Sequence, residues 1–423
     1  MERRSFLKSA TAVSAFTILK PGIAFGTNAN SAIRMGIIGC GGRGTAVITS
    51  ILKNTGTVII AMGDLFDDKL QKAKVNLNKL NTEKGLPEVP KTNFYQGSKA
   101  CFALLDNKDV DAVLISSPCY SHAGYIEAAL ASGKHVYSEK PVAVDVAGCE
   151  QVIRLGEMAK GKLSLAIGFQ IRFASAYVEM VRRIQQGDLG EIINAQLYYF
   201  SSGLPVNPYN NMSYDEARIR NQYHFLALSG GNLIDQGIHM LDVCNWALQT
   251  HPLKAVGTGG KKGGSDFGDI WTNYQVLYEY PDGVNVCYHN TQQGTQSGDV
   301  CARFIGTKGI AEAHYSGGVF IQGEKPWDSG IPKCEDAVLT AEQRAAGIFL
   351  SSLQDADANK DIAFIKSIET GKYINEAQSG SESTLTAILG RTAAMAGEEI
   401  TWDELIFSNG RLDPMLDLAQ FDK

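Results

Sequence analysis

The segment 34–44 constrains the fold of this chain more than any other stretch of its sequence. A mostly apolar run over residues 33–38 leads directly into Gly39-Cys40-Gly41-Gly42-Arg43-Gly44, and a helix-like segment, residues 45–52, follows. This order predicts a strand, a glycine turn and a helix, which together begin a doubly wound parallel α/β sheet. Such a turn places free backbone N–H groups at the start of a helix, where phosphates bind well.

Each glycine of the turn has an expected role in a dinucleotide-binding site. Gly39 would permit the tight turn, Gly41 would let the backbone approach a pyrophosphate, and Gly44 would let the helix pack closely on the strand. Glycine-rich turns also occur between ordinary strands and helices, so that alternative stays open on this motif alone. The residues of the turn that are expected to bind the cofactor are Gly39, Gly41, Gly42, Arg43 and Gly44.

An acidic residue after the next apolar run indicates which dinucleotide fits. The run Val58–Met62 is followed by Asp64, twenty residues beyond Gly44. A carboxylate at this place accepts hydrogen bonds from both ribose hydroxyls of the adenosine and repels a 2′-phosphate. The sequence therefore favours NAD as the cofactor, and NADP stays possible.

Length and charge limit the classes of partner. The 423 residues exceed one ordinary domain, and a hydrophobic fraction of 44% with 20% charged residues is typical of a globular protein with several cores. The net charge of −6 and the absence of a basic stripe argue against nucleic-acid binding. No apolar stretch is long enough to span a membrane. We therefore expect small molecules as the partners.

The first thirty residues predict an export signal rather than a folded element. Arg3-Arg4-Ser5-Phe6-Leu7-Lys8 precedes a weakly apolar stretch of small residues, which Lys20 and Pro21 interrupt. A twin arginine in this setting resembles a Tat signal, and that route carries folded proteins with their cofactor bound. We expect cleavage within residues 24–32 and a periplasmic or exported protein. An amphipathic N-terminal helix is the alternative.

The cysteines predict neither a metal centre nor a disulfide framework. The chain has eight cysteines, and no two of them form a C-x-x-C pair. Ligand spacing of the zinc-site kind is therefore absent. Several of the cysteines lie inside apolar runs, as small buried hydrophobic residues do. We expect no metal and mostly free thiols.

Alternating strand-like and helix-like segments from residue 100 to residue 159 continue the parallel sheet. A polar connection, residues 67–91, precedes them. We expect an NAD(P)-binding Rossmann domain over residues 31–160, with ligands at the carboxyl ends of its strands. Two such ends carry Ser117-Pro118 and Glu139-Lys140-Pro141.

The pattern changes in the second half, for which we expect a substrate-binding and oligomerisation domain over residues 161–423. Pro281-Asp282-Gly283 lies between two alternating runs and predicts a hairpin, and residues 306–309 predict a second one. An open, mostly antiparallel sheet with helices follows, one face of which is available to another subunit. We expect loops over residues 317–343. Helical segments over 361–368 and 383–396 are expected to return to the first domain.

Several motifs in one chain resemble the Gfo/Idh/MocA oxidoreductases, which include glucose–fructose oxidoreductase and inositol dehydrogenase. The twin-arginine leader, with Arg220-Asn221 and Tyr223-His224, is similar to an exported bacterial branch of that family. The matching motifs cover most of the chain in the expected order. They are the glycine turn, Asp111-Ala112-Val113-Leu114-Ile115-Ser116-Ser117-Pro118 with His122, Gly133-Lys134-His135-Val136 followed by Glu139-Lys140-Pro141, and Asp235-x-x-x-His239.

The resemblance implies a catalytic centre of Lys140, Asp235 and His239. Pro141 keeps Lys140 extended at the strand end, and in the family the matching lysine contacts the reacting hydroxyl and the nicotinamide side of the site. Asp235 and His239 are four residues apart, so a helix would place them on one face. An imidazole suits proton removal near neutral pH, although Lys140 is an equal candidate for the base. Further cofactor contacts are expected from Ser117, Pro118, His122, Glu139 and Lys140, and substrate contacts from Gln170, Arg172, Tyr223, Asp235 and His239.

The resemblance thus implies an NAD-dependent oxidoreductase that converts a carbohydrate or glycoside hydroxyl to a ketone and keeps its cofactor tightly bound. We expect a homo-oligomer that forms through the C-terminal sheet. The alternative is an NAD-dependent glycosidase similar to glycoside hydrolase family 109, which uses transient oxidation and elimination. Lys140 favours net oxidation, because members of that glycosidase family tend to lack the lysine. A non-catalytic sugar-binding protein is a third possibility, which the intact Lys140, Asp235 and His239 disfavour.

Overall fold

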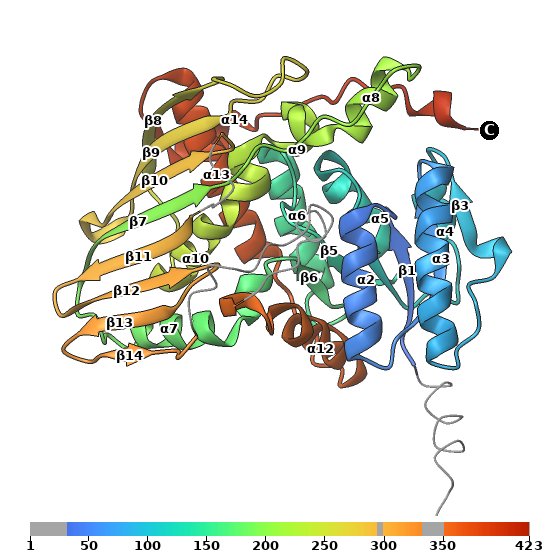
Figure 1. The fold of residues 1–423 in the computed structure, drawn as a ribbon, viewed down its shortest axis with the longest axis horizontal. Coiled ribbons are helices and arrows are strands. Elements are labelled where there is room, and N and C mark those ends of the chain that lie inside the picture. The colour runs from blue at the N-terminus through green and yellow to red at the C-terminus, as the bar shows by residue number, and fades with distance from the viewer. Residues whose placement is uncertain (1–31, 294–298, 332–350, 423) are drawn as a thin grey trace, which may run out of the picture.

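Two β-sheets with helices packed between and around them form the protein in a computed structural model, as Figure 1 shows. The structure describes residues 32–293, 299–331 and 351–422. The twin-arginine segment and Cys334 lie outside these residues. The expected fold class, a Rossmann domain followed by a domain with a mostly antiparallel open sheet, is confirmed.

The first sheet has six parallel strands in the order β3-β2-β1-β4-β5-β6. The chain therefore reverses its direction of winding at β1 and β4, and the carboxyl ends of these two strands are where such sheets bind ligands. The strands are β1 Arg34–Ile38, β2 Val58–Asp64, β3 Phe94–Gln96, β4 Ala112–Ile115, β5 His135–Ser138 and β6 Leu165–Ile167. The helices are α2 Gly42–Asn54, α3 Asp67–Glu83, α4 Ala100–Leu105, α5 His122–Ala131 and α6 Val146–Ala159.

The polar connection expected over residues 67–91 contains helix α3, Asp67–Glu83. Its buried side includes only a few apolar residues, Leu70, Ala73 and Leu77, and most of the remaining residues are polar. Asp67 and Asp68 lie in the first turn, where the helix dipole favours negative charge. The apolar stripe was too narrow to dominate the polar composition of this segment.

The second sheet has nine strands in the order β14-β13-β12-β11-β7-β10-β9-β8-β15. Only β7 and β10 pair in parallel. Both expected hairpins are confirmed, as β9 with β10 and β11 with β12. Two strands, β13 and β14, lie where loops were expected. The strands are β7 Ile192–Phe200, β8 Lys254–Gly260, β9 Asn273–Glu279, β10 Asn285–Thr291, β11 Val300–Gly306, β12 Gly309–His314, β13 Val319–Gly323, β14 Trp327–Asp328 and β15 Ile400–Thr401.

The helices of the second domain lie between its sheet and the first domain, so the other face of the sheet carries no helix in Figure 1. The chain returns to the first domain as expected, because α12 packs on α2 and α13 packs on α6. Phe364 and Ile365 of α12 belong to the core of the first domain. The helices are α7 Ser175–Gln185, α8 Tyr214–Arg220, α9 Leu226–Ser229, α10 Ile238–Leu248, α12 Ala356–Glu369, α13 Ala377–Ala396 and α14 Trp402–Ser408.

The seven cysteines among the described residues are free thiols, and six of these thiols are buried. Within the same residues, every helix is too short or too polar to cross a membrane.

Candidate active site

The glycine turn between β1 and α2 leaves no room for side chains at two of its positions. Gly39 has φ of +92°, and a Cβ there would lie 2.5 Å from the backbone of Ser116. A Cβ on Gly44 would lie 2.1 Å from the carbonyl oxygen of Gly39. Only glycine allows this turn and this close approach of α2 to the end of β1.

The other two glycines face open space. A Cβ on Gly41 or Gly42 would meet no atom within 4 Å, and both residues line a cavity of about 360 Å³. Gly41 precedes the first turn of α2, where free N–H groups and the helix dipole favour an anion. This arrangement fits the pyrophosphate of a dinucleotide, which needs both bare backbone and space.

Substitutions in the turn should separate these two roles. Gly41→Ala is expected to leave the thermal midpoint of the cofactor-free protein unchanged or slightly higher, and to weaken NAD binding at least about tenfold, a loss of about 1.4 kcal/mol. Gly44→Ala is expected to lower the thermal midpoint itself, because its Cβ overlaps Gly39. Calorimetry with and without NAD measures both effects, and equal NAD affinity in Gly41→Ala and wild type would contradict the phosphate assignment.

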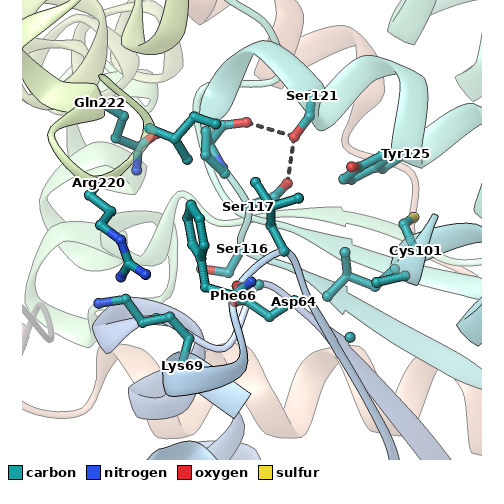
Figure 2. A pocket seen from close by; sticks show the side chains of 18 of the residues that line it. Asp64, Phe66, Lys69, Cys101, Ser116, Ser117, Ser121, Tyr125, Arg220 and Gln222 are labelled. Carbon is teal, nitrogen blue, oxygen red and sulfur yellow. Dashed lines mark hydrogen bonds between the residues drawn. The ribbon is translucent and has the colours of Figure 1, made fainter. Parts of the chain in front are cut away.

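Asp64 lines the same cavity at the end of β2. One carboxylate oxygen accepts a hydrogen bond from the backbone N–H of Cys40 at 2.6 Å, and the other accepts from that of Phe66 at 2.9 Å. Burial raises the pKa of Asp64, and each oxygen keeps a second lone pair for a hydroxyl donor. Figure 2 shows Phe66, Lys69 and Arg220 beside it.

The opposite wall of the cavity comes from the end of β4. Ser117 and Pro118 line it, and the hydroxyl groups of Ser117 and Ser121 lie 2.7 Å apart (Figure 2). His122 is buried, and its ring nitrogens lie 2.9 Å from the carbonyl oxygen of Ser117 and 2.6 Å from that of Pro141. Burial lowers the pKa of His122, and a neutral imidazole donates from one ring nitrogen only, so it hydrogen-bonds to one of these two carbonyl groups at a time.

A second cavity of about 200 Å³ adjoins the first and shares part of its wall. It lies between the two domains, because Lys140 follows β5 whereas Asp235 and His239 belong to the second domain. Of the expected substrate residues, Gln170 and Tyr223 also line it. The residues common to both cavities are Arg43, Ser116, Ser117, Gln222 and Tyr223.

Lys140 and Asp235 meet across the boundary between the domains. The ammonium group of Lys140 donates a hydrogen bond to the backbone carbonyl of Asp235 and lies 4.0 Å from its carboxylate. The expected single helix through Asp235 and His239 is corrected: residues Leu233–Gly237 form a π-helical turn, and α10 begins at Ile238. Such turns are rare in proteins overall, and those that occur often lie at functional sites.

His239 presents a neutral imidazole to the second cavity. Burial lowers the pKa of His239 well below its usual range, and the positive charges of Lys140 and Arg43 lower it further. Its Nδ1 is buried and has no hydrogen-bond partner among the described residues, and the same holds for Oε1 of Gln170. Buried polar atoms without partners are costly in a folded protein. Both residues line the second cavity, so a polar group bound there would lie close to these side chains.

Glu139 is buried beside the second cavity and forms an ion pair of 3.0 Å with Arg43 of the glycine turn. Arg43 lines both cavities, so this pair fixes a side chain at their shared wall. A lone buried carboxylate would be costly, and the arginine compensates its charge.

Comparisons with known proteins decide the family. Residues 33–167 match the model of an oxidoreductase family with an NAD-binding Rossmann fold, and residues 177–312 match the GFO/IDH/MocA C-terminal domain. The chain belongs to the GFO/IDH/MocA family. The expected family, its NAD-binding domain and the assignment to the oxidoreductases are thereby confirmed.

Curated relatives and solved structures of the GFO/IDH/MocA family agree with this assignment. Myo-inositol 2-dehydrogenase of Thermotoga maritima is 23% identical over 87% of this chain and 97% of its own length. Inositol 2-dehydrogenase of Salmonella typhimurium is 26% identical over 66% and 73%. The scyllo-inositol dehydrogenase of Lactobacillus casei, solved with NAD(H) and scyllo-inositol, has a TM-score of 0.66 at 23% identity, covering 88% of this chain and 99% of that one.

Arg172 differs from what was expected of it in this GFO/IDH/MocA chain. It lines neither cavity, and its guanidinium group donates hydrogen bonds of 2.8–3.1 Å to the carboxylate of Asp242. Asp242 also accepts a hydrogen bond from Ser383 at 2.8 Å. The structure therefore places Arg172 in an ion pair with the buried Asp242 of α10, and outside the lining of both cavities.

Sequence reasoning missed several residues that line the cavities. Phe66 and Lys69 follow Asp64 closely, and their position just after β2 could have indicated them. The second cavity also includes Tyr199 at the end of β7 and Gln236 of the π-helical turn. Leu418, close to the C-terminus, lines the first cavity, and no feature of its own sequence predicts that contact.

Proposed function

We propose that the protein is an NAD-dependent dehydrogenase that oxidises a hydroxyl group of a carbohydrate or polyol to a ketone. One observation carries the proposal: Lys140 and His239, from different domains, line one cavity that shares a wall with the glycine-lined cavity. When bound, NAD supplies the hydride acceptor for such an oxidation.

The residues of the second cavity account for the remaining steps. Neutral His239 takes the proton of the substrate hydroxyl, because burial and the nearby positive charges lower its pKa and the residue lines this cavity. The ammonium group of Lys140 donates a hydrogen bond to the same oxygen and stabilises the negative charge that develops on it. Asp235 compensates the charge of Lys140, and its backbone carbonyl holds the ammonium group in place.

Polar side chains around this cavity favour a substrate with several hydroxyl groups. Gln170 and Gln236 offer both donors and acceptors, and Tyr199 and Tyr223 offer hydroxyl groups. The names of the relatives point the same way, since those proteins act on inositols. A solved neighbour from Caulobacter crescentus is an aldose-aldose oxidoreductase, at 22% identity and a TM-score of 0.63 over 88% of this chain and 99% of that one.

The C-terminal tail, residues 410–422, supports tight retention of the cofactor. It runs beside α8, where the guanidinium group of Arg218 donates to the carbonyl oxygens of Pro414 and Met415 at 2.7 and 3.1 Å. Its last residues reach the first domain: Asp422 accepts hydrogen bonds from the N–H and the hydroxyl of Ser98 at 2.7 and 2.8 Å. Figure 1 shows the tail extending past α8 to the C-terminus.

Helix α8 reaches the same edge of the first cavity. Arg220 forms an ion pair of 2.8 Å with Asp68, and its guanidinium carbon lies 4.0 Å from the centre of the Phe66 ring. Phe66 also packs edge-on against Phe421 of the tail, with ring centres 5.4 Å apart. Residues of the second domain thus cover the side of the cavity near Asp64, where an adenosine ribose is expected. We infer that NAD exchanges slowly and is regenerated in place.

We further propose that the protein is exported through its twin-arginine leader with the cofactor already bound, and that it is a homo-oligomer. Val256 and Leu277 face each other on neighbouring strands of the helix-free face of the second sheet, and both are exposed. Cell fractionation with and without Arg3-Arg4, and light scattering of the purified protein, test these two proposals. A cytoplasmic protein, or a monomer, would contradict the respective one.

An assay without added cofactor tests the proposed reaction. Purified protein would be incubated with a panel of inositols, aldoses and nitrophenyl glycosides, and both ketone products and reduction of the retained NAD would be measured. A ketone product together with reduced NAD supports the dehydrogenase. Released nitrophenol with no net ketone would instead support the family 109 type of glycosidase, and binding without either product would contradict catalysis.

A further inference from the structure

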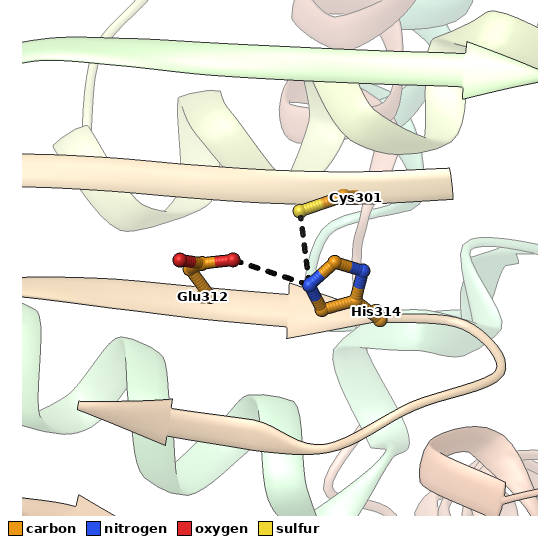
Figure 3. A group of neighbouring side chains, drawn as sticks. All are labelled: Cys301, Glu312 and His314. Atoms are coloured by element: carbon orange, nitrogen blue, oxygen red, sulfur yellow. Dashed lines mark hydrogen bonds and ion pairs between the residues drawn. The ribbon is translucent and has the colours of Figure 1, made fainter. Parts of the chain in front are cut away.

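Three side chains with metal-binding atoms meet on neighbouring strands of the second sheet (Figure 3). Cys301 of β11 lies directly opposite His314 of β12 in the strand register, and Glu312 precedes His314 by two residues on the same face. The absence of local ligand spacing predicted no metal centre. Here the strand pairing, rather than spacing along the chain, brings the donor atoms together.

Two of the distances between the donor atoms are close to those around a single tetrahedral ion. Nε2 of His314 lies 3.6 Å from Sγ of Cys301 and 3.2 Å from Oε2 of Glu312. Zinc binds sulfur at about 2.3 Å and nitrogen or oxygen at about 2.0–2.2 Å, so tetrahedral angles separate such atom pairs by about 3.6 and 3.4 Å. All three donor atoms lie within 4.8 Å of one another, so one ion could contact them once the side chains have closed around it.

The surroundings of His314 resemble the outer shell of a metal site. Oδ1 of Asp299 lies 3.4 Å from Nδ1, the other ring nitrogen of His314. Carboxylates at this place commonly orient a metal-binding imidazole and raise its basicity. Cys301 is buried, so its sulfur is shielded from bulk solvent.

Two groups compete with a cation at this cluster. Arg303 forms an ion pair of 3.0 Å with the oxygen of Glu312 that faces His314. Hydrogen bonds that the imidazole donates to Asp299, then to Cys301, raise the pKa of His314 to about 10, so a metal must displace a proton. Ions that prefer imidazole and thiolate, such as zinc, can do so, whereas magnesium and calcium prefer oxygen ligands. The second carboxylate oxygen of Glu312 could maintain the ion pair with Arg303 while the first binds the ion.

We propose that Cys301, Glu312 and His314 bind a zinc-like divalent ion, with Asp299 orienting the imidazole and solvent completing the coordination. This site is separate from the proposed dehydrogenase centre and needs no NAD. The ion links the ends of β11 and β12. It therefore stabilises the position of Tyr315, the residue after His314. The ring of Tyr315 packs against that of His239, with ring centres 6.3 Å apart.

Metal uptake by the untagged full-length protein tests the proposal. The protein would be stripped with a chelator, loaded with zinc or cobalt(II), and desalted before its metal content and spectrum are measured. We expect one equivalent of metal, a thiolate-to-cobalt charge-transfer band, and a higher thermal midpoint with zinc. Cys301→Ser should abolish the charge-transfer band, and His314→Ala should abolish the retention of metal. The control Cys287→Ser, which removes an exposed thiol on β10, should change neither.

The variants also show which outcome overturns the site. Asp299→Asn should weaken zinc binding roughly 10–100-fold without abolishing it, as expected for a residue that acts through His314. Circular dichroism of each metal-free variant establishes that it is folded. A wild-type protein that retains no metal, or folded Cys301→Ser and His314→Ala variants that retain it fully, would leave the cluster a hydrogen-bonded one only.

Discussion

Lys140→Ala and His239→Ala are each expected to lower kcat for hydroxyl oxidation by roughly 10²–10⁴-fold, while the protein keeps its NAD. This is the usual effect of removing a positioned acid, base or charge-stabilising group. Neither residue lines the cavity beside the glycine turn. The amount of NAD that denaturation releases from each variant should therefore match that from wild type. Reduction of the retained NAD on adding substrate measures the rate, and mass spectrometry measures the cofactor.

The control for these variants is Lys162→Ala, which removes an exposed lysine after α6 and should leave both the rate and the cofactor unchanged. A wild-type rate in either Lys140→Ala or His239→Ala would contradict the assignment of the centre. Loss of NAD in one of them would instead indicate that the residue holds the cofactor.

The pH profile distinguishes His239 from Lys140 as the base. A base acts in its deprotonated form, so the rate falls as the pH drops through its pKa. Because burial and the nearby positive charges lower the pKa of His239, we expect the acid limb well below pH 6.5, the usual value for histidine. A limb well above neutral pH, absent in Lys140→Ala, would assign the base to Lys140.

Local steric requirements made the cofactor site predictable from the sequence. Gly39 and Gly44 are needed for contacts within a few residues of the turn, so their spacing alone indicated their roles. Lys140 and His239 came from the resemblance to a family, since no periodicity places a lysine after β5 beside an imidazole on α10. The structure brings them into one cavity because the two domains meet there.

Long-range contacts account for what the sequence did not predict. An isolated arginine such as Arg172 gives no sign that Asp242, seventy residues away, will bind it instead of a substrate. The cluster around His314 depends on the register of β11 and β12. A predicted hairpin does not by itself say which residues lie opposite each other. The tail has no periodic apolar pattern, so its contacts with Phe66 and Ser98 follow from the folded arrangement only.

Shortening the tail is expected to have the second large effect, on cofactor exchange rather than on chemistry. A chain that ends at Gly410 should release NAD at least about tenfold faster than wild type, which requires the loss of only about 1.4 kcal/mol. Partial burial of Leu418 and the edge-on pair of Phe421 with Phe66 together contribute about 1–2 kcal/mol by themselves. Exchange of bound NAD for isotopically labelled NAD, followed by mass spectrometry, measures the rate.

Because truncation also removes the partners of Arg218 on α8, a milder variant is needed. Phe421→Ala combined with Asp422→Ala leaves those contacts in place and removes only the attachment to Phe66 and Ser98. Phe407→Ala is the matched control. It removes an exposed phenylalanine of α14, which lies just before the tail in the sequence.

The tail variants distinguish a tail that slows NAD exchange by covering the cavity from a tail that binds NAD directly. If the tail acts by covering the cavity, it must open before NAD leaves or enters, so its loss should raise both rates and change the equilibrium affinity less than the exchange rate. If its residues instead hold the cofactor directly, dissociation alone should accelerate. A double variant that is folded, shown by an unchanged thermal midpoint, and that exchanges NAD as slowly as wild type would exclude both. Retention would then depend on Asp64, the glycine turn and the remaining residues at this edge of the cavity, such as Arg220.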